Sequence, residues 1–138
     1  MRIMAIDYGD AHTGIAISDP TGFLAGFTTT IDAYRPEVVA DRIAALIQEH
    51  GVEELVLGHP INMDGSRGPR SEKAHAMKQL LEERTSLPVV LWDERRTTID
   101  AHQILFNSGK NAKKRKKVVD AVAASLILEG YLTFKKNH

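Results

Sequence analysis

The sequence contains no cysteine and no long apolar segment. The absence of cysteine excludes disulfides, thiol nucleophiles and zinc sites with thiolate ligands, and it fits a reducing compartment such as the cytoplasm. No apolar run approaches the roughly 18 residues of a membrane-spanning helix. An acid, Asp7, comes too early for a secretory signal peptide. These absences predict a soluble, cytoplasmic protein that does not use a membrane.

Linkers and internal repeats are also lacking. The chain has 138 residues, the size of one domain, and 43% of them are hydrophobic, so it can bury a substantial core. We therefore expect a single domain over residues 1–138.

The net charge is zero, but the charges are unevenly distributed. Six of the eight residues at 110–117 are basic and none is acidic, while the rest of the chain carries a formal charge of −6. One positive segment on an acidic body indicates a local contact with a polyanion, although a solvated loop is the simpler alternative. The basic residues are Lys110, Lys113, Lys114, Arg115, Lys116 and Lys117.

Short apolar segments alternate with amphipathic ones. Three β-rich segments come first, at 2–7, 14–18 and 24–30, and a helix follows from Pro36 to Gly51. Further strands are expected at 53–58 and 88–92, with helices around 74–81, 97–109 and 118–134. This order predicts an α/β fold. Its five-stranded mixed sheet would have an antiparallel meander first, parallel crossovers after it, and helices on both faces.

Three acids stand at the ends of apolar segments. Asp7 ends the first strand, Glu94 closely follows the strand that ends at Trp92, and Asp120 lies in the first turns of the last helix. Asp120 shares one row of that helix with largely apolar residues, which directs it toward the sheet. The other members of the row are Ala124, Ile127 and Tyr131. Sites in such sheets gather at the carboxyl ends of parallel strands.

Each acid also has an ordinary structural explanation. Asp7 could begin a turn, Glu94 could pair with a neighbouring arginine, and Asp120 could interact with the helix dipole. Carboxylates that lie close together repel one another, so a cluster of three requires a cation. Oxygen ligands alone favour Mg²⁺ or Mn²⁺. A metal site next to lysines suited to a polyanion suggests hydrolysis of phosphodiester bonds.

Four collinear segments resemble the YqgF family over nearly the whole chain. They are MAIDYGDAHTGIAISD, LGHPINMDGSRGPRSE, WDERRTT and KKRKKVVDAVAASLIL. The family consists of small bacterial proteins with a ribonuclease H-like fold. They are described as Holliday-junction-resolvase-like and linked to maturation of the 5′ end of the small-subunit ribosomal RNA precursor. The resemblance therefore implies a ribonuclease H-like domain with metal-dependent nuclease activity.

The resemblance assigns roles to residues of this chain. It implies that Asp7, Glu94 and Asp120 are the catalytic acids and the ligands of one or two Mg²⁺ ions. The basic segment would then bind the nucleic-acid backbone without reading its sequence. If Glu94 is not a ligand, Asp93 and Asp64 are the next candidates.

Two positions depart from the family pattern. Many members carry a Lys-Arg pair after the first acid, where this chain has the residues Ala11, His12 and Thr13. Contact with the nucleic-acid backbone would then be weaker at this turn, unless a protonated His12 makes that contact. His59 is the second departure, and it receives no role.

Several alternatives remain open at this point. The substrate could be precursor rRNA or branched DNA, and cleavage of a four-way junction usually requires a two-fold dimer, so both monomer and homodimer are possible. A non-catalytic RNA-binding assembly factor with the same fold is a rival. The segment DYGDAHTG also resembles the first phosphate loop of the actin, heat-shock chaperone and sugar-kinase superfamily, whose ATPases need two such domains.

Overall fold

The computed structural model describes residues 1–19, 25–59, 68–93 and 112–137. Within α4, side chains are described from Ala121 to Lys136. The described elements, in chain order, are β1 (Ile3–Asp7), β2 (His12–Ser18), β3 (Ala25–Asp32), α1 (Pro36–His50), β4 (Glu54–His59), α2 (Pro69–Arg84), β5 (Val89–Asp93) and α4 (Ala112–Asn137).

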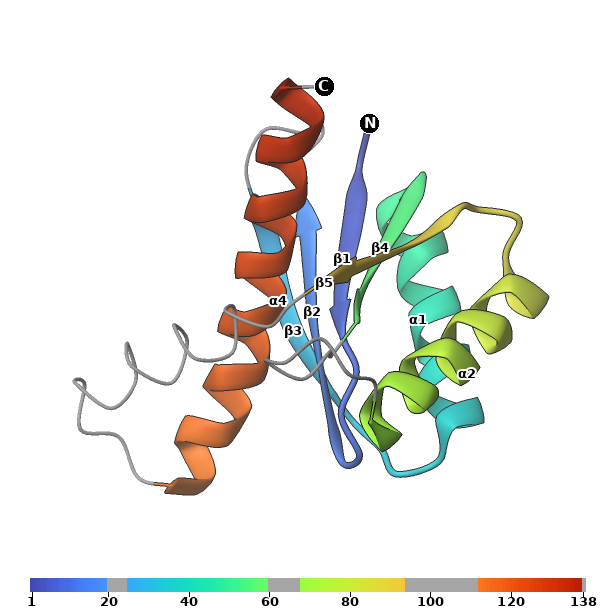
Figure 1. Ribbon diagram of the computed structural model, residues 1–138, viewed down its shortest axis with the longest axis vertical. Coiled ribbons are helices and arrows are strands. Elements are labelled where there is room, and N and C mark those ends of the chain that lie inside the picture. Colours follow the sequence, from blue (N-terminus) through green and yellow to red (C-terminus); the bar gives the residue numbers. More distant parts are fainter. Residues whose placement is uncertain (20–24, 60–67, 94–111, 138) are drawn as a thin grey trace.

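The five strands form one mixed sheet in the order β3-β2-β1-β4-β5 (Figure 1). The pairs β1–β2 and β2–β3 are antiparallel, while β1–β4 and β4–β5 are parallel. The predicted meander and parallel crossovers are therefore confirmed. Since β1, β3, β4 and β5 run in the same direction, they finish at one end of the sheet, the carboxyl end. The opposite end is the amino end.

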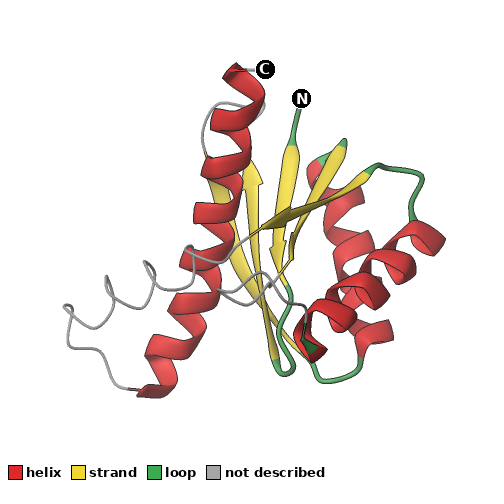
Figure 2. Cartoon of the chain, in the orientation of Figure 1, coloured by secondary structure: helices red, strands yellow, loops and turns green. Residues whose placement is uncertain are grey.

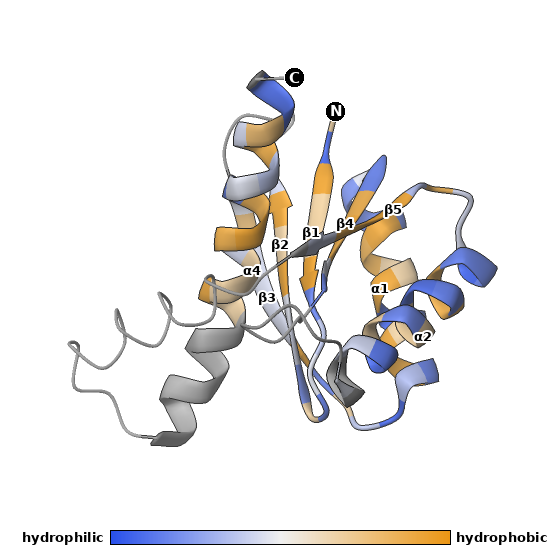
Figure 3. Ribbon diagram, in the orientation of Figure 1, coloured by the Kyte–Doolittle hydropathy of each residue, from blue (hydrophilic) through white to orange (hydrophobic). Residues whose placement is uncertain are grey.

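Helices cover both faces of the sheet, as predicted. Helices α1 and α2 pack on one face and α4 packs on the other (Figure 2). Alternate residues of β1 divide between two cores: Met4 and Ile6 on the α1–α2 face, Ile3 and Ala5 on the α4 face. Figure 3 shows the apolar residues concentrated in the central strands and in the parts of α1 and α4 beside them.

Helix α1 shows how local sequence sets an element. Pro36 occupies its first turn, where the missing N–H costs nothing. Gly51 ends it in the left-handed conformation, with φ of 66°, and its backbone N–H donates to the Ile47 carbonyl. The predicted apolar stripe includes Val39 and Ile43, which are buried against the sheet.

The final helix begins earlier than predicted. Helix α4 starts at Ala112 rather than at 118, so the backbone of residues 113–117 is helical and the alternative of a solvated loop is wrong for them. Lysine and arginine are good helix formers, but they carry no apolar stripe to reveal the first turns. Lys110 and the helix predicted at 97–109 lie outside the described residues. None of the described helices is long and apolar enough to span a membrane.

Candidate functional site

The carboxyl end of the sheet holds the first predicted acid. Asp7 is the last residue of β1, the central strand, and is paired in register with Gly14 of β2. It is only 8% exposed. Because Ile3 and Ala5 pack in the core under α4, strand alternation places Asp7 on the same α4 face. A nearly buried acid thus stands where the central strand ends, as the sequence predicted.

Helix α4 crosses this same face. Tyr131 and Lys135, near its C-terminal end, contact Glu54 at the start of β4, so the N-terminal part of α4 points toward the carboxyl end of the sheet (Figure 1). Of the row that was predicted to face the sheet, Ala124, Ile127 and Tyr131 are buried in the core that includes Ile3 and Ala5. The row is therefore confirmed for its described members.

The remaining predicted acids are not described at the level of side chains. Asp120 lies in α4, one turn before Ala124, and only its backbone is described. Glu94 and Asp64 lie outside the described residues, and Asp93 ends β5 with only its backbone described. In the described part of the chain, no three histidine, aspartate or glutamate side chains lie close enough to hold a metal ion. The predicted metal site therefore stays a prediction.

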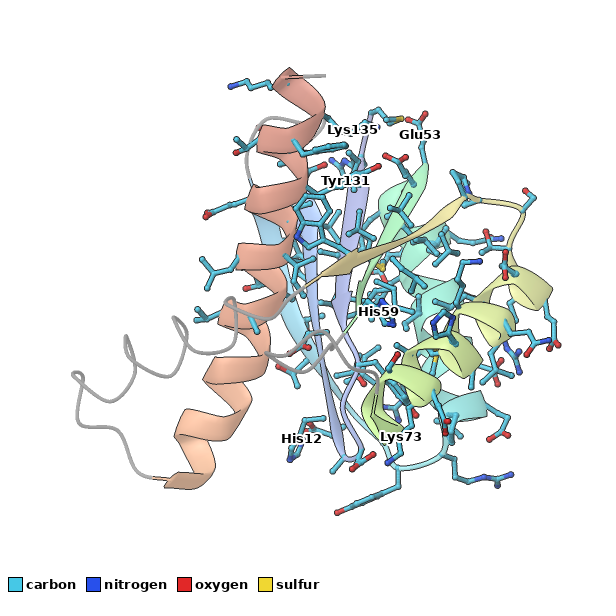
Figure 4. The ribbon with its side chains drawn as sticks, in the orientation of Figure 1. His12, Glu53, His59, Lys73, Tyr131 and Lys135 are labelled. Carbon is cyan, nitrogen blue, oxygen red and sulfur yellow. The ribbon has the colours of Figure 1, made fainter. Side chains whose placement is uncertain are left out.

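The turn after Asp7 and the strand that follows it are joined to neighbouring elements by polar side-chain contacts. The Asp10 carboxylate accepts from Lys73 of α2 at 2.5 Å, and Asp32 at the end of β3 contacts His12 Nδ1 at 2.7 Å. Figure 4 shows His12 and Lys73 at this end of the sheet. The predicted role of His12 in contacting the nucleic-acid backbone stays a prediction. Exposed pairs of this kind stabilise a fold by about 1 kcal/mol at most.

The turn after Asp7 packs closely against its surroundings at Gly9 and at Tyr8. A Cβ atom built at Gly9 would lie closer to the His12 carbonyl oxygen than nonbonded atoms approach, so the turn has no room for a side chain there. Tyr8, the next residue after Asp7, packs partly against the α1–α2 core. Burial, and then the negative charge of Asp10, raises the pKa of its hydroxyl.

The α1–α2 face of the carboxyl end contains a buried polar cluster that the sequence did not reveal. His59 Nε2 and Ser71 Oγ are 2.6 Å apart and both residues are buried. The His75 ring meets the His59 ring edge-on, with centroids 4.9 Å apart. These contacts join the end of β4 to α2, so His59 has a structural role (Figure 4). The one feature of the sequence that points to this cluster is the spacing of Ser71 and His75, which lie one helical turn apart.

Thr13 adds another polar group to this face. Its side chain is completely buried, and its hydroxyl oxygen has no hydrogen-bond partner among the described residues. It follows His12 in β2, at one of the positions where the sequence departs from the family pattern.

The amino end of the sheet carries a different kind of polar contact. Glu54 accepts a hydrogen bond from the Tyr131 hydroxyl at 3.1 Å and one from Lys135 Nζ at 2.7 Å. Figure 4 shows Tyr131 and Lys135 at this end of α4. Trp92 packs edge-on against Tyr131 and Phe134, with ring centroids 5.6 Å away in each case. Trp92 is therefore partly buried against the core under α4.

Comparisons with known proteins place the chain in a family. A family model described as "RuvX: Holliday junction resolvase" matches residues 1–134. The chain belongs to the RuvX family. The resemblance to YqgF proteins, which was inferred from four motifs, is thereby confirmed.

Relatives in this family match the chain from end to end. A protein of Halothermothrix orenii is 45% identical over 135 residues, covering 98% of this chain and 96% of its own length. A protein of Listeria monocytogenes is 46% identical over 134 residues, covering 96% and 97%. Both are named "Putative pre-16S rRNA nuclease".

Solved structures confirm the ribonuclease H-like fold of this RuvX family member. T. thermophilus RuvC, in complex with a Holliday junction substrate, superposes with a TM-score of 0.66. The match covers 99% of this chain and 96% of RuvC. Because the sequence identity is 13%, the match shows similarity of fold alone.

Proposed function

We propose that this chain is a metal-dependent endonuclease that hydrolyses phosphodiester bonds, with the small-subunit ribosomal RNA precursor as its substrate. Asp7 carries the proposal: a nearly buried carboxylate at the carboxyl end of the central strand, facing α4. Family membership and relatives named as pre-16S rRNA nucleases support it. A ribosomal precursor substrate also supports the cytoplasmic location expected from the lack of cysteine.

The proposed metal ligands are Asp7, Glu94 and Asp120. An oxygen-only set of this kind suits Mg²⁺ or Mn²⁺. When bound, the metal would lower the pKa of a water molecule and stabilise the charge that develops on the phosphate. Asp120 is supported by its helix row, since the described members of that row are buried against the face that carries Asp7.

Strand alternation favours Glu94 over Asp93 as the second ligand. On β5, Val89 and Leu91 pack on the α1–α2 face, while Val90 and Trp92 pack on the α4 face. If the alternation continues beyond the described residues, a residue two positions after Trp92 falls on the face of Asp7, and that residue is Glu94.

The chain would hold its substrate with the basic residues at the start of α4. Lys113, Lys114, Arg115, Lys116 and Lys117 occupy the first two turns of the helix that reaches toward the carboxyl end of the sheet. Together with Lys110, they would contact phosphates and so hold a strand beside Asp7. Contacts of this type do not discriminate between RNA and branched DNA.

The test is cleavage of a precursor rRNA fragment and a four-way DNA junction, side by side, with Mg²⁺ and with excess chelator. We expect cleavage of the RNA that depends on Mg²⁺ and declines in acid, because ligand carboxylates must be ionised to bind metal. Preferential cleavage of the junction would instead establish the resolvase alternative. Binding of RNA without any cleavage would establish the non-catalytic assembly factor, and cleavage in excess chelator would contradict the metal-dependent mechanism.

A further inference from the structure

A short loop connects β3 to α1 at the carboxyl end of the sheet. It consists of Ala33, Tyr34 and Arg35, between the last residue of β3 and Pro36. The Ala33 backbone N–H donates to the Ala11 carbonyl at 3.1 Å, which fixes the loop to the turn that follows Asp7. The loop therefore belongs to the same end of the molecule as the proposed active site.

Tyr34 is 82% exposed, much more than the other exposed large apolar side chains of the described chain. Phe27 and Phe134 are 40% and 45% exposed, and each rests against other rings, those of His50 and of Trp92 respectively. No aromatic ring contact involves Tyr34 in the part of the chain that the structure describes. Its ring is therefore open to a planar partner.

The position of Tyr34 is suited to a strand that reaches Asp7. From the register of β1, β2 and β3, and at ordinary strand spacings, the Cα atoms of Asp32 and Asp7 are roughly 12 Å apart. Tyr34 follows two residues later, and the exposed Arg35 adds a cation that attracts phosphates.

The loop is also held at both sides. Pro36 has a fixed φ, the Ala33 hydrogen bond anchors the other side, and Arg35 has extended backbone at the N-cap of α1. A ring presented on such a short loop loses little conformational freedom when a base stacks on it. A single exposed aromatic residue is common on protein surfaces, so the location and the anchoring carry the argument rather than the exposure alone.

We propose that Tyr34 is a stacking platform for an unpaired base of the nucleic-acid substrate, next to the cleavage site. This inference rests on the proposed nuclease function and adds a substrate requirement to it, a single-stranded segment on the β3–α1 side of Asp7. Because stacking uses the face of a base, it tolerates any sequence but requires that the base is not enclosed in a duplex.

The test measures binding by fluorescence anisotropy in excess chelator, so that its result does not depend on catalysis. The probes are a short end-labelled oligouridine RNA and a blunt RNA duplex. We expect Tyr34→Ala to weaken oligouridine binding by roughly 5- to 100-fold, as loss of a base-stacking ring does. Binding of the duplex should change by less than about twofold, because its bases are not available to stack on a side chain.

Two variants control the result. Tyr34→Phe keeps the ring and should bind oligouridine like the natural protein. Phe27→Ala removes an exposed ring from β3 near the amino end of the sheet and should leave binding unchanged.

The proposal is overturned if Tyr34→Ala binds normally, if Tyr34→Phe loses as much affinity, or if the natural protein does not bind oligouridine. The proposed nuclease function fails separately, if Asp7→Asn leaves Mg²⁺-dependent cleavage intact.

Discussion

The two ends of the sheet use their polar groups differently. At the amino end, the Glu54 carboxylate accepts hydrogen bonds from Tyr131 and Lys135, so its charge is matched by a protein cation. At the carboxyl end, strand alternation separates the buried groups, with Asp7 on the α4 face and His59 with Ser71 on the other. The same helix, α4, covers both ends. The hydrogen bonds of Glu54 therefore join β4 to α4 at the amino end, whereas the carboxyl end carries the proposed site at Asp7.

The largest effect is expected where α4 approaches the carboxyl end. For about five duplex phosphate contacts, the slope of log K against log salt should be near −4 to −5. Replacing Lys113, Lys114 and Lys116 together with Ala should flatten that slope by about two to three units, one for each lost contact. Stability should barely change, because alanine is a good helix former.

Lys136→Ala, at the other end of α4, is the matched control and should leave the salt slope unchanged. A triple variant with the slope and affinity of the natural protein would mean that the start of α4 does not contact phosphates.

Gly9→Ala should be the most disruptive single change in the turn after Asp7. The new Cβ meets the backbone oxygen of His12, which has no flexible end to move aside. Overpacking of this kind costs about 1–3 kcal/mol of unfolding free energy, and cleavage should fall along with stability because the turn carries Asp7. Denaturant unfolding and a cleavage assay on the same preparation check both effects. A fully stable and active Gly9→Ala variant would contradict the conclusion that the turn has no room for a side chain at this position.

Tyr131 should make stability depend on alkaline pH. Burial, and then its hydrogen bond to Glu54, raises the pKa of Tyr131 to about 12, from 10.0 in an unfolded chain. Below pH 10 the tyrosine is protonated in both states, and its contribution is fully present. Between the two values only the unfolded state ionises, so up to about 3 kcal/mol is lost as pH rises. Tyr131→Phe should remove this part of the decline in alkaline unfolding curves, and an unchanged decline would contradict it.

The smallest effect is expected from Gly130→Ala in α4. Its Cβ would lie 3.5 Å from the Trp92 ring, an ordinary contact distance, so the side chain fits without movement. Replacing a glycine in a helix interior should raise the unfolding free energy by up to about 1 kcal/mol, with no change in cleavage. Thermal unfolding checks the gain, and a loss of stability would mean that Trp92 is packed more tightly than its contacts suggest.

Local signals predicted some elements well and others poorly. The start and end of α1 followed from Pro36 and Gly51, because a first-turn proline and a left-handed glycine act within a few residues. The end of β1 at Asp7 followed from an abrupt change from apolar to acidic. The beginning of α4 was missed, since its basic turns contain no apolar stripe that marks a helix.

The sequence named the residues of the candidate site, but it did not predict on which face of the sheet each side chain lies. That Asp7 shares the α4 face requires the register of the sheet and the packing of Ile3 and Ala5, which no sequence spacing states. The contact of His59 with Ser71 was missed for the same reason, because it depends on which side of α2 meets β4. Tyr34 gave no sequence signal, since its exposure is a property of the folded chain.

The most direct test of the account compares Asp7→Asn with Glu54→Gln in a Mg²⁺-dependent cleavage assay, below the unfolding temperature of both variants. Each replaces one carboxylate by its amide, buried at Asp7 and partly buried at Glu54, at opposite ends of the same sheet. Asp7→Asn should lower the cleavage rate by at least about 100-fold, since even changes around metal ligands cost roughly 10- to 100-fold. Glu54→Gln should lower stability and keep the rate within about twofold. Equal losses in both variants, or full activity in Asp7→Asn, would contradict the assignment of the chemistry to the carboxyl end.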